Sequence, residues 1–326
     1  MSDLLFTSIC VLDSNCFLGT TSGFLLRIGL NDLVTQTCND PLLTSFVASK
    51  HTKLSSTVSH ITASNSFLAI ALTTSCVVLT HDLVVRFYII SPTVIDTPST
   101  ISVLHSHNNL LFIGYKEKAP TSNFRIYNTE TQEDIQLSLP FTPTSMTTWH
   151  SDDVIQSFLI GTEEGILIVV TETGEIKAQL NILDHNQPIL SLSRNQSNLI
   201  AMFTPFHIHL MDQTLAQNFV ESQDTSPSNL IEQTTTIGNF IPRTSCALLG
   251  SDLPTPSSGV FLFAVSGLSN SIILISKEKA KAIKLEHRFP SFLDGFRDLF
   301  VVANGSLLYL FDFLGFQSSK VKIVIK

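Results

Sequence analysis

A phrase that recurs about seven times along the 326 residues most constrains what this chain can fold into. Each copy is an apolar run, a small residue, a tight polar turn and a second apolar run. The clearest copies are FLGTTSGFLLRIGL (Phe17–Leu30) and FLIGTEEGILIVV (Phe158–Val170). Gly23 and Gly165 end the two turns, where glycine tolerates a positive φ, and the flanking β-branched and aromatic residues suit strands. Each copy therefore predicts a β-hairpin.

The spacing of the copies is about 40 to 60 residues, close to the length of a four-stranded propeller blade. The weaker copies are Phe67–Ile90, Leu110–Asn128, Leu199–Asp212, Val260–Ser276 and Leu299–Phe313. A strand pattern precedes several of them, at Val58–Ala63, Ile101–Leu104, Thr144–Trp149 and Ile189–Ser193. With an outer strand after each hairpin, every unit has four strands.

A unit of this size cannot cover both faces of its own sheet, so neighbouring sheets must stack. We therefore predict an all-β fold, a seven-bladed β-propeller of four-stranded antiparallel blades, spanning 1–326 as a single domain. Val321–Ile325 has the alternation of a strand that completes the last blade. Lys277–Glu286 alone offers some helical periodicity, and it fits equally well a turn leading to an outer strand. The phenylalanines expected between blades are Phe17, Phe67, Phe112, Phe158, Phe203, Phe263 and Phe300.

The residue pairs at the ends of the predicted third strands, each with an acidic or amide second residue, carry a resemblance to a known family. They are Tyr127-Asn128 in FRIYNT, Met211-Asp212 in IHLMDQ and Phe311-Asp312 in LYLFDF. At this position the chain resembles a divergent WD-repeat β-propeller. It has no intact Trp-Asp or Gly-His dipeptide, and Trp149 is the only tryptophan. The resemblance thus implies that the family's buried hydrogen-bond network is missing from most blades.

Two shorter stretches are similar to other propellers. CVLDSNCFLGTTSGFLLRI (Cys10–Ile28) resembles the first blade of citron-homology propellers, which implies a role in vesicle tethering or kinase scaffolding. FRIYNTETQ (Phe124–Gln132) resembles a blade of the phosphoinositide-binding propellers. The Arg-Arg pair of that family is absent, which argues against inherited lipid binding.

Charge and hydropathy narrow the partners and the compartment. With 19 basic and 27 acidic residues the net charge is −8, and no two basic residues are adjacent, so we expect no nucleic-acid partner. The start, Met1-Ser2-Asp3, is acidic and Arg27 is the first basic residue, which argues against secretion. Apolar runs such as Val84–Ile90 are too short to span a bilayer. We expect a cytoplasmic protein, with the nucleus as the alternative, and no direct membrane insertion.

Cysteine usage supports an intracellular protein. The five cysteines are odd in number and have no CxxC spacing, so a disulfide framework or a metal site is disfavoured. We interpret them as reduced, buried, small apolar residues. They are Cys10, Cys16, Cys38, Cys76 and Cys246.

Two His-x-His pairs could supply metal ligands, because a spacing of two on a strand points both imidazoles to one face. His207 and His209 have this spacing, but no further ligand lies at a recognisable distance, so a polar strand face lining the channel or covering the blade is the preferred interpretation. His105 and His107 precede Asn108-Asn109 and are interpreted as turn residues.

No catalytic constellation stands out. Asp152-Asp153 and Glu163-Glu164 are adjacent carboxylates in predicted loops, where they are typical of a solvated surface. Nucleophile-elbow, dinucleotide, phosphate-loop and zinc-protease motifs are absent. We therefore assign no catalytic, cofactor-binding or metal residue, and expect no cofactor. A small-molecule enzyme, an unrecognised hydrolase or lyase that uses the central channel, remains the alternative.

Lys277, Lys279, Lys281 and Lys284 form the one basic cluster. On a strand the first three lie on one face, and lysine on an outer edge prevents sheets from pairing edge to edge. An acidic partner or peripheral association with an anionic membrane is the alternative.

Glu221–Gly259 interrupts the rhythm and contains Ser-Pro, Leu-Pro and Thr-Pro. It predicts a loop insertion at 221–259 in the sixth blade, with a strand near Thr244–Leu249. It is either a plain solvated loop or a partner-binding or phosphorylated segment. Together these patterns favour a non-enzymatic protein-protein interaction scaffold, monomeric by itself and a subunit of a multiprotein complex. A vesicle-tethering or coat-associated subunit is the alternative within trafficking.

Overall fold

The computed structural model describes most of the chain. The described residues are 4–40, 42–94, 97–116, 122–149, 156–181, 183, 187–195, 199–212, 214, 216, 230–237, 240–248, 261–268, 270–276, 279–296, 299–312 and 314–325.

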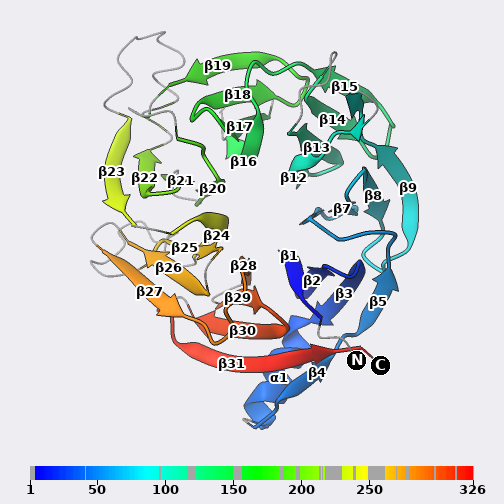
Figure 1. Cartoon of the computed structure of the whole chain (residues 1–326), viewed down its shortest axis with the longest axis vertical. Helices are drawn as coiled ribbons and strands as arrows, with labels where there is room; N and C mark the ends of the chain where they lie inside the picture. Colours follow the sequence, from blue (N-terminus) through cyan, green and yellow to red (C-terminus); the bar gives the residue numbers. More distant parts are fainter. Residues whose placement is uncertain are drawn as a thin grey trace.

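Seven antiparallel sheets surround a central channel, each with its first strand innermost (Figure 1). Blade 1 is β1 (Phe6–Leu12), β2 (Asn15–Thr20), β3 (Phe24–Gly29) and β5 (Lys50–Lys53). Blade 2 is β6 (His60–Ala63), β7 (Leu68–Ala71), β8 (Ser75–Leu79) and β9 (Val85–Ile90). Blade 3 is β12 (Ile101–His107), β13 (Leu110–Tyr115), β14 (Phe124–Asn128) and β15 (Asp134–Leu137). Blade 4 is β16 (Pro143–Trp149), β17 (Ser157–Thr162), β18 (Leu167–Thr171) and β19 (Ile176–Leu180). Blade 5 is β20 (Ser191–Arg194), β21 (Leu199–Phe203), β22 (His207–Asp212) and β23 (Ile231–Thr236).

Blade 6 is β24 (Pro242–Ala247), β25 (Phe263–Gly267), β26 (Ser271–Ile275) and β27 (Ala280–Lys284). Blade 7 is β28 (Ser291–Phe296), β29 (Leu299–Asn304), β30 (Leu307–Asp312) and β31 (Gln317–Val324), to which β4 (Ser45–Val47) adds a fifth strand. A small hairpin of β10 (Thr93–Val94) and β11 (Thr97–Pro98) links blades 2 and 3. The predicted all-β, seven-bladed propeller of four-stranded antiparallel blades is confirmed, as is the predicted strand at the end of the last blade.

The turns between the second and third strands explain the recurring phrase. Gly23 and Gly165 have φ of +80° and +82°, as predicted. A Cβ added at either would lie 2.6 Å from a backbone carbonyl oxygen of the loop that enters the next blade. The hydroxyl of the threonine three residues earlier in each turn, Thr20 or Thr162, accepts a hydrogen bond from the first backbone amide after the glycine, at 2.9 and 3.0 Å. Glycine is thus required by both conformation and space.

Apolar layers between neighbouring blades hold the ring together. There is one cluster of buried side chains at each of the seven blade junctions, including the junction of blade 7 with blade 1. The seven phenylalanines predicted for these layers are all 0 % exposed. They are Phe17, Phe67, Phe112, Phe158, Phe203, Phe263 and Phe300. Because each sheet buries both faces against its neighbours, no blade has a complete core of its own.

The acidic or amide residues at the ends of three third strands organise the turn into the outer strand. Asn128 accepts hydrogen bonds from the amides of Glu130 and Thr131, at 3.0 and 3.1 Å. Asp312 accepts two in the same way, at 3.0 and 2.8 Å, and Asp212 accepts one at 2.7 Å. These residues occupy the place expected for the WD-repeat position, and their role here is a local Asx turn.

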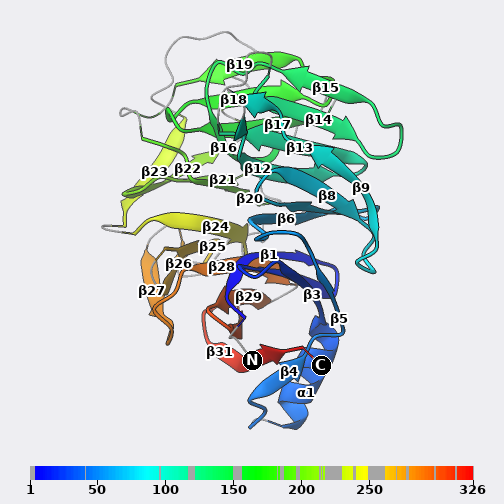
Figure 2. The same ribbon diagram turned by 45° about the vertical axis from the view of Figure 1, so that its right-hand side comes forward.

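The N-terminal part of the chain reinforces the last blade by a route that the sequence patterns did not predict. After β3 the chain forms helix α1 (Leu30–Asn39) and strand β4, which pairs in parallel with β31, and then returns to blade 1 as β5 (Figure 2). Leu30 and Leu33 are buried and α1 packs beside β3. The short apolar stripe of α1 gave too little periodicity to mark a helix. Conversely, Lys277–Glu286 contributes the outer strand β27, so its helical alternative is wrong.

Two strands lie inside 221–259, the predicted insertion of the sixth blade. β23 is the outer strand of blade 5 and β24 is the first strand of blade 6, so the range is not one continuous loop and part of it belongs to the fifth blade. The strand predicted near Thr244–Leu249 corresponds to β24. Residues 221–229, 238–239 and 249–259 lie outside the described residues, and a long loop there stays a prediction.

Candidate functional site

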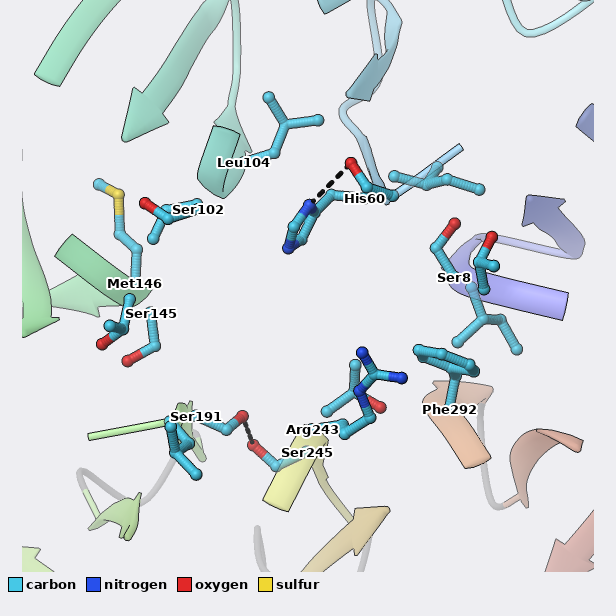
Figure 3. Close-up of a pocket in the computed structure, with 18 of the residues that line it drawn as sticks. Ser8, His60, Ser102, Leu104, Ser145, Met146, Ser191, Arg243, Ser245 and Phe292 are labelled. Carbon is cyan, nitrogen blue, oxygen red and sulfur yellow. Dashed lines mark hydrogen bonds between the residues drawn. The ribbon is translucent and has the colours of Figure 1, made fainter. Parts of the chain in front are cut away.

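The first strands of all seven blades begin at one end of the channel, where they enclose a cavity of about 490 Å³. Figure 3 shows side chains from these strands pointing into the hollow. We call this cavity the channel mouth. The side chains that line it include Thr7, Ser8, Ser59, His60, Ser102, Thr144, Ser145, Ser191, Arg243, Thr244, Ser245 and Phe292.

Hydroxyl groups dominate the lining of the channel mouth. Ser191 and Ser245 are hydrogen-bonded to each other at 2.8 Å, and Ser102 donates to the carbonyl of Pro143 at 2.7 Å. Ser8, which is only 5 % exposed, has a buried hydroxyl oxygen without a hydrogen-bond partner in the described part of the protein. A Cβ added at Gly19 would clash with this oxygen, so the Ser8 hydroxyl packs against strand β2 at the edge of the mouth.

Arg243 brings the only formal charge among the side chains that line the channel mouth. Its guanidinium lies 4.8 Å from the centre of the Phe292 ring. Among the residues that the structure describes, no carboxylate forms an ion pair with it. Partial burial lowers the pKa of Arg243 without removing its charge. Burial, and secondarily the charge of Arg243, lower the pKa of His60 to about 4, so His60 is neutral at physiological pH.

Large exposed apolar side chains form an arc beside the channel mouth. In an antiparallel four-stranded blade, the turn between strands 2 and 3 shares an end with the start of strand 1. Phe206 and Leu268 lie in such turns of blades 5 and 6, and Ile241 and Phe289 lie just before β24 and β28. They are 42 to 48 % exposed, and the amide of Leu268 donates to the carbonyl of Ile241 at 3.0 Å. We call these four residues the apolar arc.

The turns between strands 2 and 3 are polar in blades 1, 2 and 4. The turn between strands 2 and 3 carries Thr21 and Ser22 in blade 1, Thr73 and Thr74 in blade 2, and Glu163-Glu164 in blade 4. The apolar arc is therefore confined to one side of the channel mouth, over blades 5 to 7. Such a patch next to a polar hollow is typical of a protein-binding surface.

Deeper in the ring, the half-buried carboxylate of Asp294 lies near three cysteines. Burial raises the pKa of Asp294 to about 6, although backbone amides of Val11 and Gly295 donate to it. Burial, and then the charge of Asp294, raise the pKa of Cys10, Cys16 and Cys246 well above the usual range. Such thiols stay protonated and unreactive.

The predicted burial is confirmed for four of the five cysteines. All five thiols are free, and Cys10, Cys16, Cys76 and Cys246 are buried. Cys38 is exposed in α1, so the prediction of burial is wrong for this residue, because the helix that carries it lies outside the ring. In the described ranges, no three His, Cys, Asp or Glu side chains come together as they would around a metal ion.

The histidine pairs lie away from the channel mouth. His207 and His209 share one face of β22, a third strand, and their ring centres are 5.8 Å apart. Nδ1 of His209 is 3.0 Å from the hydroxyl of Thr234 on β23, so the interpretation of a blade-covering face holds and a channel-lining position is wrong. His105 and His107 end strand β12 and do not lie in the turn, because β12 extends three residues beyond the predicted strand.

The other charged groups singled out from the sequence are surface features. Glu164 accepts a hydrogen bond from the amide of Thr142 at 3.1 Å, while Asp152-Asp153 lie outside the described residues. Lys279, Lys281 and Lys284 are exposed on or beside β27, as expected for an outer edge, and Lys277 is not described.

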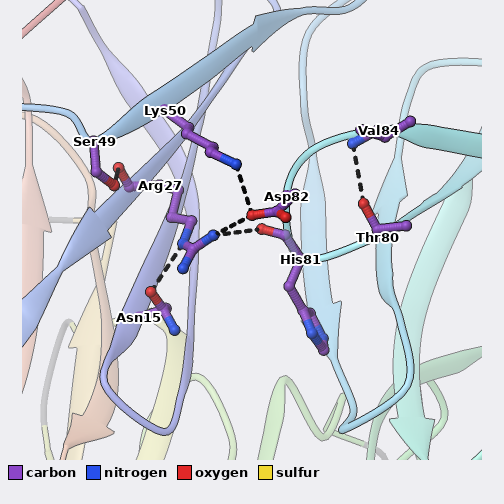
Figure 4. Close-up of polar contacts among 8 residues, drawn as sticks. All are labelled: Asn15, Arg27, Ser49, Lys50, Thr80, His81, Asp82 and Val84. Carbon is purple, nitrogen blue, oxygen red and sulfur yellow. Dashed lines mark hydrogen bonds and ion pairs between the residues drawn. The ribbon is translucent and has the colours of Figure 1, made fainter.

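A polar cluster on the opposite end of the ring joins blades 1 and 2 (Figure 4). Asp82 accepts from Arg27 at 2.8 Å and from Lys50 at 2.7 Å, and Lys50 contributes most to lowering the pKa of Asp82. Arg27 also donates to Asn15 of its own blade at 2.9 Å. All charges in this cluster are paired, which indicates a structural contact.

Sequence reasoning missed the channel mouth, although the sequence held a signal for it. A serine or threonine pair or a single serine stands at the start of most first strands, as in Thr7-Ser8, Thr144-Ser145 and Thr244-Ser245. Ser8 faces Gly19 across its hairpin and Ser145 faces Gly161, which is the same register in two blades. An alignment of the seven first strands with one another would have shown that serine or threonine recurs at this position. Arg243 could be recognised as the one charged side chain of the mouth only once the ring was closed.

Comparison with known proteins supports the fold alone. No family model matches the chain, and no curated protein matches it. Among solved structures, the WD40 domain of Neurospora crassa Pan2 is similar, with a TM-score of 0.60, 10% identity, and coverage of 92% of this chain and 86% of that one. The computationally designed Ika8 protein is also similar, with a TM-score of 0.58, 12% identity, and coverage of 98% and 87%. The chain therefore has a WD-repeat-like propeller fold.

No helix in the described ranges has both the length and the apolar character needed to cross a membrane.

Proposed function

We propose that this chain is a non-enzymatic protein-interaction scaffold that binds a partner protein at the channel mouth, as one propeller domain and as a single copy within an intracellular complex. The observation that carries the proposal is the apolar arc beside the cavity. Side chains as large as Phe206 and Phe289 are left nearly half exposed on one side of the mouth, while the corresponding turns of blades 1, 2 and 4 are polar. Burying such side chains against a partner is favourable by about 25 cal/mol per Å².

The rigidity of the ring supports this function. The loops that carry the apolar arc join strands packed on both faces, so their positions are set before a partner arrives. A preorganised surface loses little conformational freedom on binding. Free buried thiols fit a reducing compartment, and the protein-interaction role common among propellers of this fold supports the proposal by analogy.

The test removes the apolar arc without disturbing the core. A double variant, Ile241→Ser with Leu268→Ser, changes two exposed side chains that are neighbours through a backbone hydrogen bond. Quantitative affinity purification with cross-linking should show at least one partner of the unaltered chain reduced about tenfold or more. The same partner should cross-link through loops of blades 5 to 7.

The matched control lies on the opposite end of the ring. Val84 and Leu314 are exposed in turns between third and fourth strands, and a Val84→Ser, Leu314→Ser double variant should retain the partner. A second control, His207→Gln with His209→Gln, removes imidazole chemistry without touching the mouth and should retain it too. Loss of cellular function in the histidine variant, with the Ile241 and Leu268 variant fully active, would contradict the scaffold proposal and favour a chemical role for the imidazoles on β22.

A further inference from the structure

We propose that the channel mouth binds an acidic side chain, a carboxylate on a peptide segment of the partner protein, through Arg243. This inference rests on the proposed function and names the chemistry of its ligand. It is carried by two observations: Arg243 has no acidic partner among the described residues, and it lines a cavity of suitable size beside the apolar arc.

The charge balance of the channel mouth calls for an anion. Arg243 is the only charged side chain in the lining, and within the described part of the chain no carboxylate pairs with it. By contrast, Arg27 and Arg125 each bind an aspartate, at 2.8 and 2.6 Å. A partly buried guanidinium retains five donors and binds a carboxylate through two parallel hydrogen bonds.

The single charge favours a carboxylate over a phosphate. His60, the other basic group in the mouth, is held neutral by burial and by Arg243 itself. One guanidinium neutralises one carboxylate, whereas a phosphate dianion would leave excess negative charge in a partly desolvated site. Only one of Ser191 and Ser245 donates in the hydrogen bond that they share, so the O–H group of the other serine is free to donate to a remaining lone pair of the carboxylate.

The geometry places apolar contacts next to the anion site. Ile241 lies two residues before Arg243, where the chain enters β24, so the apolar arc and the guanidinium are close together in the chain at the mouth. The cavity of about 490 Å³ falls within the usual range for ligand pockets and accommodates one acidic side chain with part of its backbone. The expected ligand is therefore a glutamate or aspartate flanked by apolar residues.

The experiment uses two phage-displayed peptide libraries. Each peptide has five random residues on either side of a fixed central residue, which is Glu in one library and Gln in the other. The full chain is the bait, beside the variants Arg243→Gln, Arg243→Lys and Ile241→Ser with Leu268→Ser, each checked for an unaltered melting temperature. The unaltered chain should enrich peptides from the Glu library with apolar residues next to the glutamate.

Affinities are then measured by fluorescence anisotropy with a selected peptide and its Glu→Gln and Glu→phosphoserine forms. Arg243→Gln and the Gln peptide should each weaken binding by about tenfold or more, and combining them should weaken it little further. Arg243→Lys should recover part of the loss, and the phosphoserine form should bind more weakly than the Glu form.

The outcomes separate this inference from the proposed function. In one outcome, the selected peptides bind the Arg243→Gln variant as tightly as the unaltered chain but do not bind the Ile241 and Leu268 variant. This result overturns the anion site and leaves the scaffold proposal intact. Equal enrichment from both libraries overturns the anion site, as does a phosphoserine form that binds more tightly than the Glu form. Enrichment of no peptide, or binding that survives both sets of variants, overturns the anion site and the channel mouth as the binding surface.

Discussion

Asp294 in the last blade accepts a hydrogen bond from the backbone amide of Val11 in the first blade, with 2.7 Å between Oδ2 and N. The two residues are 283 positions apart in the chain, and their contact lies on the seam where the ring closes. The other oxygen of Asp294 accepts from the amide of Gly295 at 2.8 Å. A half-buried carboxylate thus joins the first and last blades of the propeller.

The stability of the seam should depend on the protonation of Asp294. Its pKa in the folded protein, about 6, is above the ordinary 3.8, so the folded state holds the proton more tightly than the unfolded chain. This contribution to stability is fully present below pH 3.8 and is lost as the pH rises through about 6. Between pH 8 and pH 4, the free energy of unfolding of Asp294→Asn should fall relative to the unaltered chain by about 1 to 3 kcal/mol.

Chemical denaturation across this pH range measures the effect. Leu293→Ala is the control, because it removes a buried neighbour on β28 and should lower stability by the same amount at every pH. A constant difference between Asp294→Asn and the unaltered chain would show that the seam is insensitive to this proton.

Gly23 and Gly165 should not tolerate a side chain. Alanine at either position meets a positive φ and a carbonyl oxygen 2.6 Å from its Cβ, so we expect a loss of about 1 to 3 kcal/mol, seen as a lower denaturant midpoint. Gly295→Ala is the matched control, since its nearest contact would be 3.6 Å away, and it should change stability by less than about 0.5 kcal/mol. Unchanged midpoints for both turn variants would contradict the assigned conformation.

The extra strand β4 should contribute to the last blade through one side chain. Phe46 is 6 % exposed in the layer between blades 7 and 1, and Phe46→Ala should cost about 3 to 5 kcal/mol. Val47, its neighbour on the same strand, is 36% exposed, and Val47→Ala should cost less than about 0.5 kcal/mol.

Hydrogen exchange of the Lys322 amide reports on this pairing directly, because it donates to the carbonyl of Thr44, next to β4, at 2.9 Å. Its exchange should accelerate in Phe46→Ala and stay unchanged in Val47→Ala. Equal protection in both variants would mean that β4 stays paired without its buried side chain.

His105 should make the protein sensitive to acid. Burial, and then the neighbouring His107, lower the pKa of His105 to about 4. Its Nε2 lies beside the rings of Phe112 and Phe158 and has no hydrogen-bond partner among the described residues. As the pH falls from 6.5 to 4, His105 becomes protonated in the unfolded chain but stays neutral in the folded protein, so the free energy of unfolding decreases. His105→Leu should reduce this loss by about 1 to 3 kcal/mol.

The measurement is the melting temperature from pH 7 to pH 4. Val103→Ala, in the same layer between blades 3 and 4, should lower the melting temperature without changing its dependence on pH. An acid response in His105→Leu identical to that of the unaltered chain would assign the sensitivity to other groups.

Local patterns in the sequence determined the blades. The positions of Gly23 and Gly165, the seven buried phenylalanines and the first strands follow from the twofold alternation of a strand and the conformational needs of a turn. These requirements act between residues close in the chain, so they can be recognised directly in the sequence. Helix α1 and strand β4 were not predicted, because their buried side chains pack in the layer between blades 1 and 7, partly against residues at the far end of the chain.

The candidate site was decided by the tertiary structure. The sequence by itself determined a ring of four-stranded blades, with strands that begin in serine or threonine, but closure of the ring alone brought Arg243, His60 and Ser8 of three blades to one cavity. The charge of Arg243 became significant because the ring excludes a neutralising carboxylate from its surroundings in the described part of the protein. The physical reason is that solvation and pairing of a charge depend on groups distant in the chain, whereas strand alternation and turn geometry do not.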